Sequence, residues 1–391
     1  MPPVRRPSAL LLAAAHALND GYGGFLAALL PLLIDRLGIS LALAGLLSSV
    51  RATASSLAQP VVGEVADRIG PRWLVLAGPA ITCTAMATLG ILPSFPAVAV
   101  ALLLAGLGTA AFHPAAAALA GTATQRGHGT AMSVFSAGGT LGAALGPVTA
   151  AALVGRFGLG VTPALLAPAW ALVALLVWRM PPVARAPRRG RLQLRTHPQM
   201  PQLVRLCTVS MLRELIGLSF MSFLSVLWVS RGASVTLGGI SITVYAMSGA
   251  LGGLVGGRLS DQWGRRRVIV GALVGAIPFF YLFLITDGAL SMLFLALGGM
   301  FMLSSNPVSV IFAQELFPDH RGVVSGMVMG LAWGVGSLLI TLVGYLGDLL
   351  GLEMALGLVT TLLVPAAWVA LSLREQGPPG TGDTPAAPAL S

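Results

Sequence analysis

The segment Gly63–Arg72, with the sequence GEVADRIGPR, recurs with changes at Gly257–Arg266, with the sequence GRLSDQWGRR. Two glycines, an aspartate and a final arginine keep the same internal spacing in both copies. The second copy follows the first by 194 positions, close to half of the 391-residue chain. A repeat at half length in an apolar chain is typical of a duplicated membrane unit, the arrangement found in secondary transporters.

The composition indicates a membrane protein. Hydrophobic residues make up 56% of the chain, charged residues 9%, and the mean hydropathy is +0.87, whereas soluble domains carry about 25% charged residues. The net charge of +10 comes from arginines in short loops between apolar runs, so we expect no nucleic-acid partner. Cys83 and Cys207 fall inside apolar runs and are too few for a disulfide framework or a zinc site, so we predict neither a metal nor a cofactor.

The apolar runs predict an all-α membrane protein with twelve transmembrane helices, because runs of about 20 residues suit helices and are too long for membrane strands. Arg5 and Arg6 followed by Ala9–Ala15 imitate a signal peptide, but apolar sequence resumes at Gly21, which favours one uncleaved first helix. The expected spans are approximately 9–33, 42–66, 73–92, 96–120, 130–154, 161–178, 203–229, 236–259, 268–286, 289–313, 323–347 and 352–373.

These spans divide the chain into two bundles of six helices. We predict an N-terminal bundle over residues 1–178, a basic cytoplasmic linker over 179–202, a C-terminal bundle over 203–373 and a disordered tail over 374–391. The linker contains six arginines and no acidic residue. Its simplest role is to fix the orientation of the chain beside anionic headgroups.

The placement of the arginines predicts that orientation. If both termini are cytoplasmic, only Arg36, Arg156 and Arg231 lie outside, while Arg51 and Arg213 lie within spans. The remaining 18 of the 23 arginines then lie on the cytoplasmic side. This asymmetry follows the positive-inside rule, so we expect a multi-pass protein with both termini in the cytoplasm.

The repeated segments lie between the second and third spans and between the eighth and ninth. In these places the pattern resembles the loop motif of the major facilitator superfamily, and the resemblance covers essentially the whole chain. It implies two pseudo-symmetric six-helix bundles around a central cavity that opens to each side in turn. The first copy has Pro71 where a basic residue is common, and the second has Gln262 in place of Arg68.

Shorter motifs resemble one group within that superfamily, the fosmidomycin-resistance efflux proteins. They are HALNDG at His16–Gly21, Gln59 with Pro60, FHP at Phe112–Pro114, and the series Gly138, Gly142, Gly146 and Pro147 that the family associates with antiporters. Arg51 in the second helix is not expected from that group. The resemblance implies export of a drug-like compound coupled to protons.

Ionisable residues within the spans are the candidate functional residues, since each costs about 2.5–3.5 kcal/mol near the bilayer centre and usually faces a cavity. Asp20 and Glu214 are separated by 194 positions, so they are equivalent acids in helices one and seven. The same offset pairs Asn19 with Arg213. The residues predicted to carry the proton or line the cavity are His16, Asn19, Asp20, Arg51, His113, Arg213, Glu214 and Asn306.

Asp20 and Glu214 are predicted to carry the coupled proton, because a carboxyl within a span is a group that a proton gradient can address. His16, Asn19 and Asp20 share one face of helix one. Arg213 and Glu214 are neighbours in sequence and point about 100° apart on a helix, so we predict that they do not pair. Arg213 is expected to reach Asp20 instead, which would leave Glu214 free to titrate.

Structural roles compete with these assignments. Asp20 could brace helix one, Arg51 could extend toward the headgroups or brace helix two, and His113 could bond to carbonyls released by Pro114. Asn306 also precedes a proline, near the repeat position of His113.

The repeated loop segments are expected to form a cytoplasmic gate in which Asp67 and Asp261 join helix ends through arginines. The glycine series in helix five is either a packing seam or a gate pivot. The predicted gating residues are Gly63, Asp67, Arg68, Gly70 and Arg72 in the first copy, and Gly257, Asp261, Gly264 and Arg265 in the second.

Together these features predict a secondary active transporter, most simply a proton-coupled exporter of a small drug-like or anionic compound in a bacterial cytoplasmic membrane. The sequence contains no phosphate-cradling P-loop motif, so neither ATP-driven transport nor enzymatic activity is expected. We expect a monomer whose partners are its substrate, protons and the lipid bilayer. Two alternatives stay open: import of a small organic anion recognised by Arg51 and Arg213, and a receptor that transports nothing.

We predict that reporter proteins fused after Ser391 and within Arg179–Pro201 both show a cytoplasmic location, because of the arginine asymmetry. Paired fusions to a fluorescent protein and to alkaline phosphatase measure the two sides independently. A periplasmic signal from either site would contradict the twelve-span topology.

Overall fold

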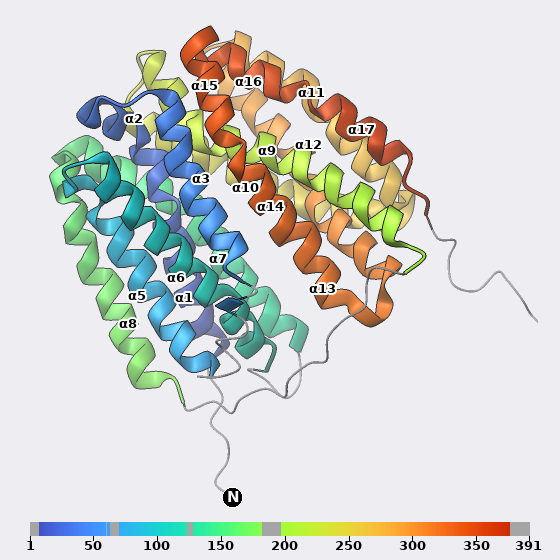
Figure 1. Cartoon of the computed structure of the whole chain (residues 1–391), viewed down its shortest axis with the longest axis horizontal. Coiled ribbons are helices and arrows are strands. Elements are labelled where there is room, and N and C mark those ends of the chain that lie inside the picture. The colour runs from blue at the N-terminus through green and yellow to red at the C-terminus, as the bar shows by residue number, and fades with distance from the viewer. Residues whose placement is uncertain (1–7, 60, 63–69, 123–127, 182–196, 376–391) are drawn as a thin grey trace, which may run out of the picture.

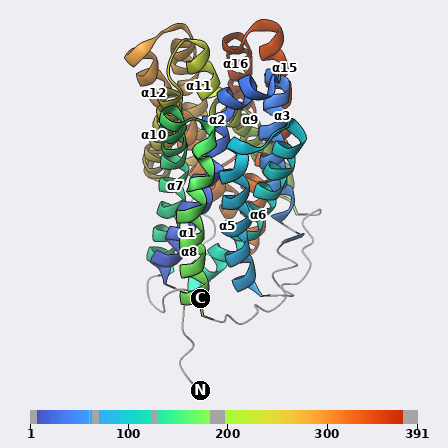
Figure 2. The same cartoon turned by 90° about the vertical axis from the view of Figure 1, so that its left-hand side faces the viewer.

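The computed structural model describes residues 8–59, 61–62, 70–122, 128–181 and 197–375, and within these ranges all regular elements are helices. Helices α1 to α8 form the N half and α9 to α17 form the C half, which lie side by side (Figure 1). After a 90° turn, the helices of the N half run roughly parallel or antiparallel to one another (Figure 2). The prediction of an all-α protein with two helical bundles is confirmed.

The N half begins with one span made of α1 (Ala9–Gly23) and α2 (Phe25–Leu37), which meet at Gly24. The other elements of this half are α3 (Leu41–Leu57), α5 (Pro71–Thr88), η1 (Leu89–Ile91), α6 (Phe95–Thr122), α7 (His128–Phe157), η2 (Leu159–Leu165) and α8 (Leu166–Arg179).

The C half contains α9 (Met200–Ser230), α10 (Val235–Trp263), α11 (Arg265–Ile285) and α12 (Gly288–Leu316). Its next span is interrupted and consists of η3 (Pro318–His320), α13 (Arg321–Gly326), the π-helical turn η4 (Met327–Leu331), α14 (Ala332–Leu338) and α15 (Ile340–Leu350). The last span is formed by α16 (Leu352–Thr360) and α17 (Leu363–Leu371).

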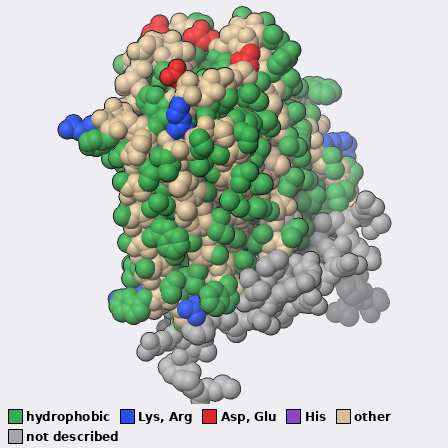
Figure 3. Space-filling model, turned by 60° about the vertical axis from the view of Figure 1, so that its left-hand side comes forward, with side chains coloured by type: hydrophobic (Ala, Val, Ile, Leu, Met, Phe, Trp, Pro, Cys, Tyr) green, Lys and Arg blue, Asp and Glu red, His purple; other side chains and the backbone are tan. Residues whose placement is uncertain are grey.

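Eleven runs of helix in the described residues are long and apolar enough to cross a membrane, and α3 adds a shorter apolar helix. The expected span 42–66 is therefore seen only in part, because residues 60 and 63–69 lie outside the described residues. Apolar side chains cover much of the flank shown in Figure 3, whereas the visible acidic side chains gather at one end. This surface suits a chain that is surrounded by lipid along its length.

The bundle has two ends. The far end holds the connections from α2 to α3, from α9 to α10 and from α15 to α16, and the terminal end holds the start of α1, as Figure 1 shows. Successive spans alternate in direction between these ends. The second repeated segment, where α10 meets α11, therefore lies at the terminal end.

The two halves contact each other at the far end. The Asp348 carboxylate of α15 accepts hydrogen bonds from the backbone N–H groups of Leu41, at 2.8 Å, and Ala42, at 2.9 Å. It thereby caps the N-terminus of α3 from the other half of the molecule. Further along α3, the hydroxyl of Ser49 donates to the carbonyl oxygen of Ser337 at 2.7 Å. The contact continues at Thr53, whose hydroxyl lies 2.9 Å from that of Ser337. Beyond the end of α3 the helices of the two halves diverge toward the terminal end (Figure 1).

A second contact between the halves joins α7 to α10. The hydroxyl of Thr243 donates to the carbonyl oxygen of Ala144 at 2.6 Å. A Cβ on Gly239 would lie 2.5 Å from the Cβ of Ala151, so the two helices approach very closely. Helix α7 therefore belongs to the N half and also contacts the C half directly.

Helix α7 packs against α1 along a seam of glycines. A Cβ placed on Gly142 or Gly146 would lie 2.0 Å from the backbone oxygen of Ala17 or Gly21, respectively. Gly138 repeats this close approach one turn earlier. Because no side chain fits at such distances, the glycines are what allow the two backbones to touch. In this conformation the glycine series is a packing seam.

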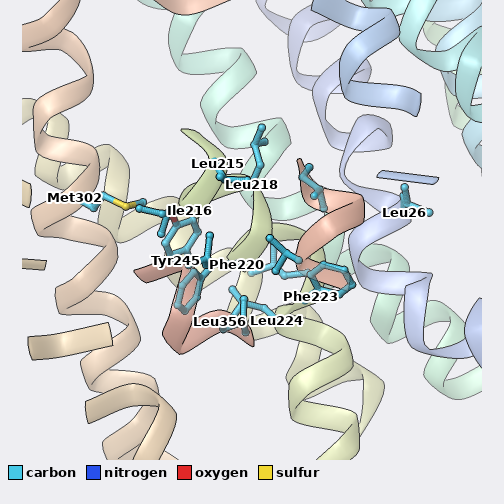
Figure 4. Packing of buried hydrophobic residues seen from close by; sticks show 14 of the residues in the cluster. Leu26, Leu215, Ile216, Leu218, Phe220, Phe223, Leu224, Tyr245, Met302 and Leu356 are labelled. Atoms are coloured by element: carbon cyan, nitrogen blue, oxygen red, sulfur yellow. The ribbon is translucent and has the colours of Figure 1, made fainter. Parts of the chain in front are cut away.

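The larger apolar core surrounds α9 in the C half, where Phe220 lies on the side of Tyr245 and Met302 and Phe223 lies on the side of Leu26 (Figure 4). Leu26 of α2 belongs to the same cluster, so this core also crosses to the N half. A smaller core in the N half gathers residues of α1, α5, α6, α7 and α8. The helices that carry the polar clusters described below pack into these two cores.

Gly142→Ala is expected to destabilise the protein, because its Cβ would meet the Ala17 backbone at 2.0 Å and overpacking typically costs about 1–3 kcal/mol. Gly271→Ala on α11 is a matched control, since a Cβ there meets nothing within 4 Å. Thermal unfolding in detergent should give a clearly lower midpoint for the first variant only. Equal midpoints would show that the α1–α7 seam is not closely packed.

Candidate functional site

The structure brings His16, Asn19, Asp20 and His113 together, and we call these four residues the acid–imidazole cluster. The Nε2 atom of His113 lies 2.8 Å from Asp20 Oδ1, and the Nε2 atom of His16 lies 3.1 Å from Asp20 Oδ2. The amide of Asn19 donates to Asp20 Oδ1 at 3.0 Å. The side chains of His16, Asp20 and His113 are 14%, 20% and 28% exposed, so the cluster is largely buried but accessible.

Three helices position this cluster. Helix α1 presents His16 and Asp20 one turn apart on the same face, as their spacing predicts, and α6 supplies His113 from the opposite side. On α7, the carbonyl oxygen of Phe135 lies 2.8 Å from His16 Nδ1, and the two rings stack with centroids 4.2 Å apart. A Cβ on Gly139 would lie 2.4 Å from the imidazole, so α7 leaves room for that ring.

Arg51 of α3 adds a positive charge beside the cluster. Its charge interacts with that of Asp20, and its Nη1 atom would lie 3.5 Å from a Cβ placed on Gly23 of α1. The guanidinium is therefore directed toward α1, which disfavours a role in reaching the headgroups. One carboxylate thus faces two imidazoles and a guanidinium.

His16, Asp20 and His113 carry ligand atoms that all lie within 4.8 Å of one another. Each of these groups is already engaged by its neighbours through hydrogen bonds. The nearby Arg51 would also repel a divalent cation. We therefore describe the cluster as a hydrogen-bonded network and not as a metal centre.

The C half contains a second polar cluster around Arg213 and Glu214 of α9. The Arg213 guanidinium donates to Glu214 Oε1 at 2.9 Å and to the hydroxyls of Ser305 and Ser309 on α12 at 3.3 Å each. The side chain of Arg213 is only 2% exposed, and that of Glu214 is 13% exposed. This is a buried ion pair, whose charges depend on each other for compensation.

Some buried polar atoms around this pair have no hydrogen-bond partner in the described part of the chain. They are the hydroxyl oxygens of Tyr245 and Ser210 and the Nε atom of Arg213. The Tyr245 hydroxyl lies close to α9, 3.3 Å from where a Cβ on Gly217 would be. Unpaired buried polar groups are uncommon and are often found where a ligand or water binds.

The structure corrects two predictions about Arg213. Arg213 pairs with Glu214, and it does not reach Asp20, whose partners are His16, His113 and Asn19. The 100° separation of adjacent helical residues fixes only the direction of the Cβ atoms. The long arginine stem can fold along the helix surface and return its guanidinium to the neighbouring carboxylate. Glu214 is therefore not a free acid.

Asn306 takes no part in either cluster. It is half-buried on α12, and no hydrogen bond or ion pair of the described residues connects it with Asp20 or Arg213. Its neighbours Ser305 and Ser309 hold the arginine instead. In the sequence, their spacing of four residues within an apolar run indicates one polar face of α12.

The second copy of the repeated segment joins three helix ends. Arg265 contacts Asp261 at 2.6 Å, Glu315 at 2.9 Å and the hydroxyl of Ser260 at 2.6 Å. These contacts tie the end of α10 to the start of α11 and the end of α12. In the first copy, Arg72 donates a 3.4 Å hydrogen bond to a backbone oxygen of α8. Asp261 and Arg265 thus form a contact of the expected kind, and their gating role stays a prediction.

The backbone conformation explains why both copies have a glycine at the position of Gly70 and Gly264. Gly70 and Gly264 precede α5 and α11 with φ of +92° and +91° and ψ of 146° and 153°. Only glycine adopts such a positive φ without strain. Gly257 differs, because a Cβ there would meet nothing within 4 Å. The predicted gating residues Gly63, Asp67 and Arg68 lie outside the described residues.

A cavity of about 410 Å³ lies at the far end. Its lining includes Asp35 and Arg36 of α2, Gly155 of α7, and Ser234 and Thr236 at the start of α10. None of its lining residues belongs to the acid–imidazole cluster. Because both halves contribute to its walls, its shape depends on how the halves are placed.

Comparison with known proteins places these features in a family. The sequence profile of the Major Facilitator Superfamily matches residues 11–227 and 206–390. The chain is 30% identical over 356 residues to the fosmidomycin resistance protein of Escherichia coli, covering 88% of this chain and 87% of that protein. It is 29% identical over 369 residues to the uncharacterized MFS-type transporter YfnC of Bacillus subtilis, covering 88% of each.

Solved structures show the same fold. A bacterial homolog to the human lysosomal transporter Spinster, in an inward-facing and unoccupied conformation, superimposes with a TM-score of 0.82 at 17% identity over 97% of this chain and all of that one. The nucleoside transporter NupG superimposes with a TM-score of 0.70 at 17% identity, over 93% of this chain and 98% of that one.

Arg213→Met is expected to destabilise the protein by about 3–5 kcal/mol, because it leaves the Glu214 carboxylate buried without its partner. Arg213→Met combined with Glu214→Gln should recover much of that loss, since it removes both charges. Chemical or thermal unfolding of the wild type, both single variants and the double variant forms a complete cycle. Additive effects of the two substitutions would show that the pair is not coupled.

Proposed function

This chain belongs to the Major Facilitator Superfamily, and from that premise we propose that it exports a small drug-like or anionic compound in exchange for protons. It is a multi-pass membrane transporter of small molecules and not an enzyme. The observation that carries the proposal is the acid–imidazole cluster, in which a largely buried carboxylate lies between two imidazoles. Such a cluster within a transmembrane bundle is suited to proton exchange.

The arrangement of the two halves supports binding of the substrate from the terminal end. The halves are joined at the far end and diverge toward the terminal end (Figure 1), and the cluster side chains are partly exposed. With both termini in the cytoplasm of a bacterial cell, this conformation would receive its substrate from the cytoplasm. An exporter must bind its substrate from that side.

The two acids have different surroundings, which favours Asp20 over Glu214 as the site of proton coupling. Glu214 is neutralised by Arg213, which is itself fixed by two serine hydroxyls. Asp20 is bound by imidazoles, which can take up and release protons near neutral pH. The proton gradient would then supply about 2.3 kcal/mol per charge for each 100 mV.

We assign the two halves and the repeated loops to the alternating movement. The halves would act as two domains joined by the basic linker, in a monomer of the bacterial cytoplasmic membrane. When the terminal end closes, the helix ends held by Asp261 and Arg265 would approach the start of α5, where the first copy of the segment ends. The Arg213 cluster, with the unpartnered Tyr245 hydroxyl nearby, would help to bind the substrate.

Import of a small organic anion is the second candidate, and Arg51 is the observation in its favour. Its cationic group lies beside the cluster and has no ion pair shorter than 4.0 Å among the described residues. Counterflow and uphill uptake in membrane vesicles of known orientation separate the two directions. The 30% identity to a fosmidomycin resistance protein supports export and makes fosmidomycin the first compound to test.

We predict that Asp20→Asn abolishes uphill export driven by a pH gradient and leaves substrate counterflow largely intact, because the amide lacks the negative charge with which the cluster binds a proton. Glu214→Gln should impair stability more than coupling, since its carboxylate serves Arg213. Both variants are measured in proteoliposomes, with the substrate chosen by a toxicity screen in an efflux-deficient host. Full uphill export by Asp20→Asn would rule out Asp20 as the coupling acid.

A further inference from the structure

His16 makes more hydrogen bonds than a neutral imidazole can. Its Nδ1 atom lies 2.8 Å from the carbonyl oxygen of Phe135, and its Nε2 atom lies 3.1 Å from Asp20 Oδ2. A carbonyl oxygen and a carboxylate oxygen only accept hydrogen bonds, and a neutral imidazole has one N–H group. Both contacts are satisfied only when one further proton lies between His16 and Asp20.

His113 does not require such a proton. Among the described residues, the hydrogen bond of its ring joins Nε2 to Asp20 Oδ1 at 2.8 Å, and the neutral tautomer with hydrogen on Nε2 satisfies this bond. Asn19 donates its amide hydrogen to the same carboxylate oxygen at 3.0 Å. The two donors at Oδ1 are therefore accounted for, and the additional proton belongs to the Oδ2 side, which faces His16.

We propose that His16 holds the coupled proton as an imidazolium that bridges Phe135 and Asp20, and that loss of this proton loosens α7 from α1. The proposal rests on the proposed proton-coupled export and names the residue that performs the coupling. On release, the Nε2–H bond breaks, its electron pair stays on the nitrogen, and the proton passes to water on the open side. Neutral His16 then has one N–H and must give up one of its two acceptors.

The charged and titratable groups around His16 come from three helices. Asp20 of α1 stabilises the imidazolium, whereas Arg51 of α3 and any charge on His113 of α6 oppose it. At this contact α7 contributes the carbonyl of Phe135, and α5 and α8 contribute apolar side chains to the adjoining core. Opposed charges of this kind keep the proton bound but exchangeable.

Helix α7 connects this event to the other half of the protein. It holds His16 at Phe135, and two to three turns later it accepts the Thr243 hydroxyl of α10 at Ala144. A change in how α7 is held at Phe135 therefore acts on an element that also closes the far end. An imidazolium at His16 stabilises the conformation seen here, in which the far end is closed.

Nitrogen-15 NMR of the full-length protein in nanodiscs, labelled only at histidine, tests where the proton sits. The chain has five histidines, and His16→Gln identifies the His16 signals by their loss. We expect both nitrogens of His16 to be protonated at neutral pH and one of them to lose its proton as the pH rises. In His113→Gln the doubly protonated signal should remain. A His16 ring with a single N–H from neutral to acidic pH, in folded protein, would overturn the proposal.

Transport measurements separate this proposal from the proposed function. In proteoliposomes, His16→Gln should keep substrate counterflow but lose at least tenfold in uphill export driven by a pH gradient. If the wild type couples export to protons and His16→Gln does so equally well, only this proposal is overturned. If the wild type shows no proton-driven export, the proposed function is overturned, and the NMR measurement still decides the protonation of His16.

Discussion

The hydrogen bond between His16 and the backbone carbonyl of Phe135 is the contact on which the candidate site depends. It fixes the plane of the imidazole, so that the other ring nitrogen faces Asp20, which in turn holds His113 and Asn19. This bond can form because the glycines on α7 allow that helix to lie directly against α1. A packing constraint between two backbones thus determines the electrostatics of the cluster.

The duplicated architecture gives the two halves equivalent acids in different surroundings. Asp20 lies among imidazoles, which exchange protons readily, and its cluster is partly exposed. Glu214 is paired with an arginine that is 2% exposed and that is held by two hydroxyls of α12. The two halves therefore differ in role. The N half contains the groups suited to exchange protons, and the C half contains a fixed ion pair beside polar atoms that have no partner among the described residues.

Much of this could be predicted from the sequence, because helix periodicity fixes which neighbours on one helix share a face. It placed His16, Asn19 and Asp20 together, and the family motif added His113. Periodicity does not predict where a long side chain ends, so the pairing of Arg213 with Glu214 was missed. Nor does it indicate which backbone carbonyl a ring will meet, because the carbonyl of Phe135 has no side-chain signal. The cap that Asp348 places on α3 depends on the register between the two halves, which only the assembled fold defines.

We infer that protonation of the cluster controls the relative position of the two halves. Spin labels at Trp178→Cys and Trp263→Cys, both exposed at the terminal end, report this placement in a background with Cys83 and Cys207 replaced by alanine. Pulsed electron paramagnetic resonance then measures the distance between the halves as a function of pH. We expect a long distance at low pH and a growing population of shorter distances as the pH rises, with this response lost in His16→Gln. A distance distribution that does not change with pH in the wild type would contradict it.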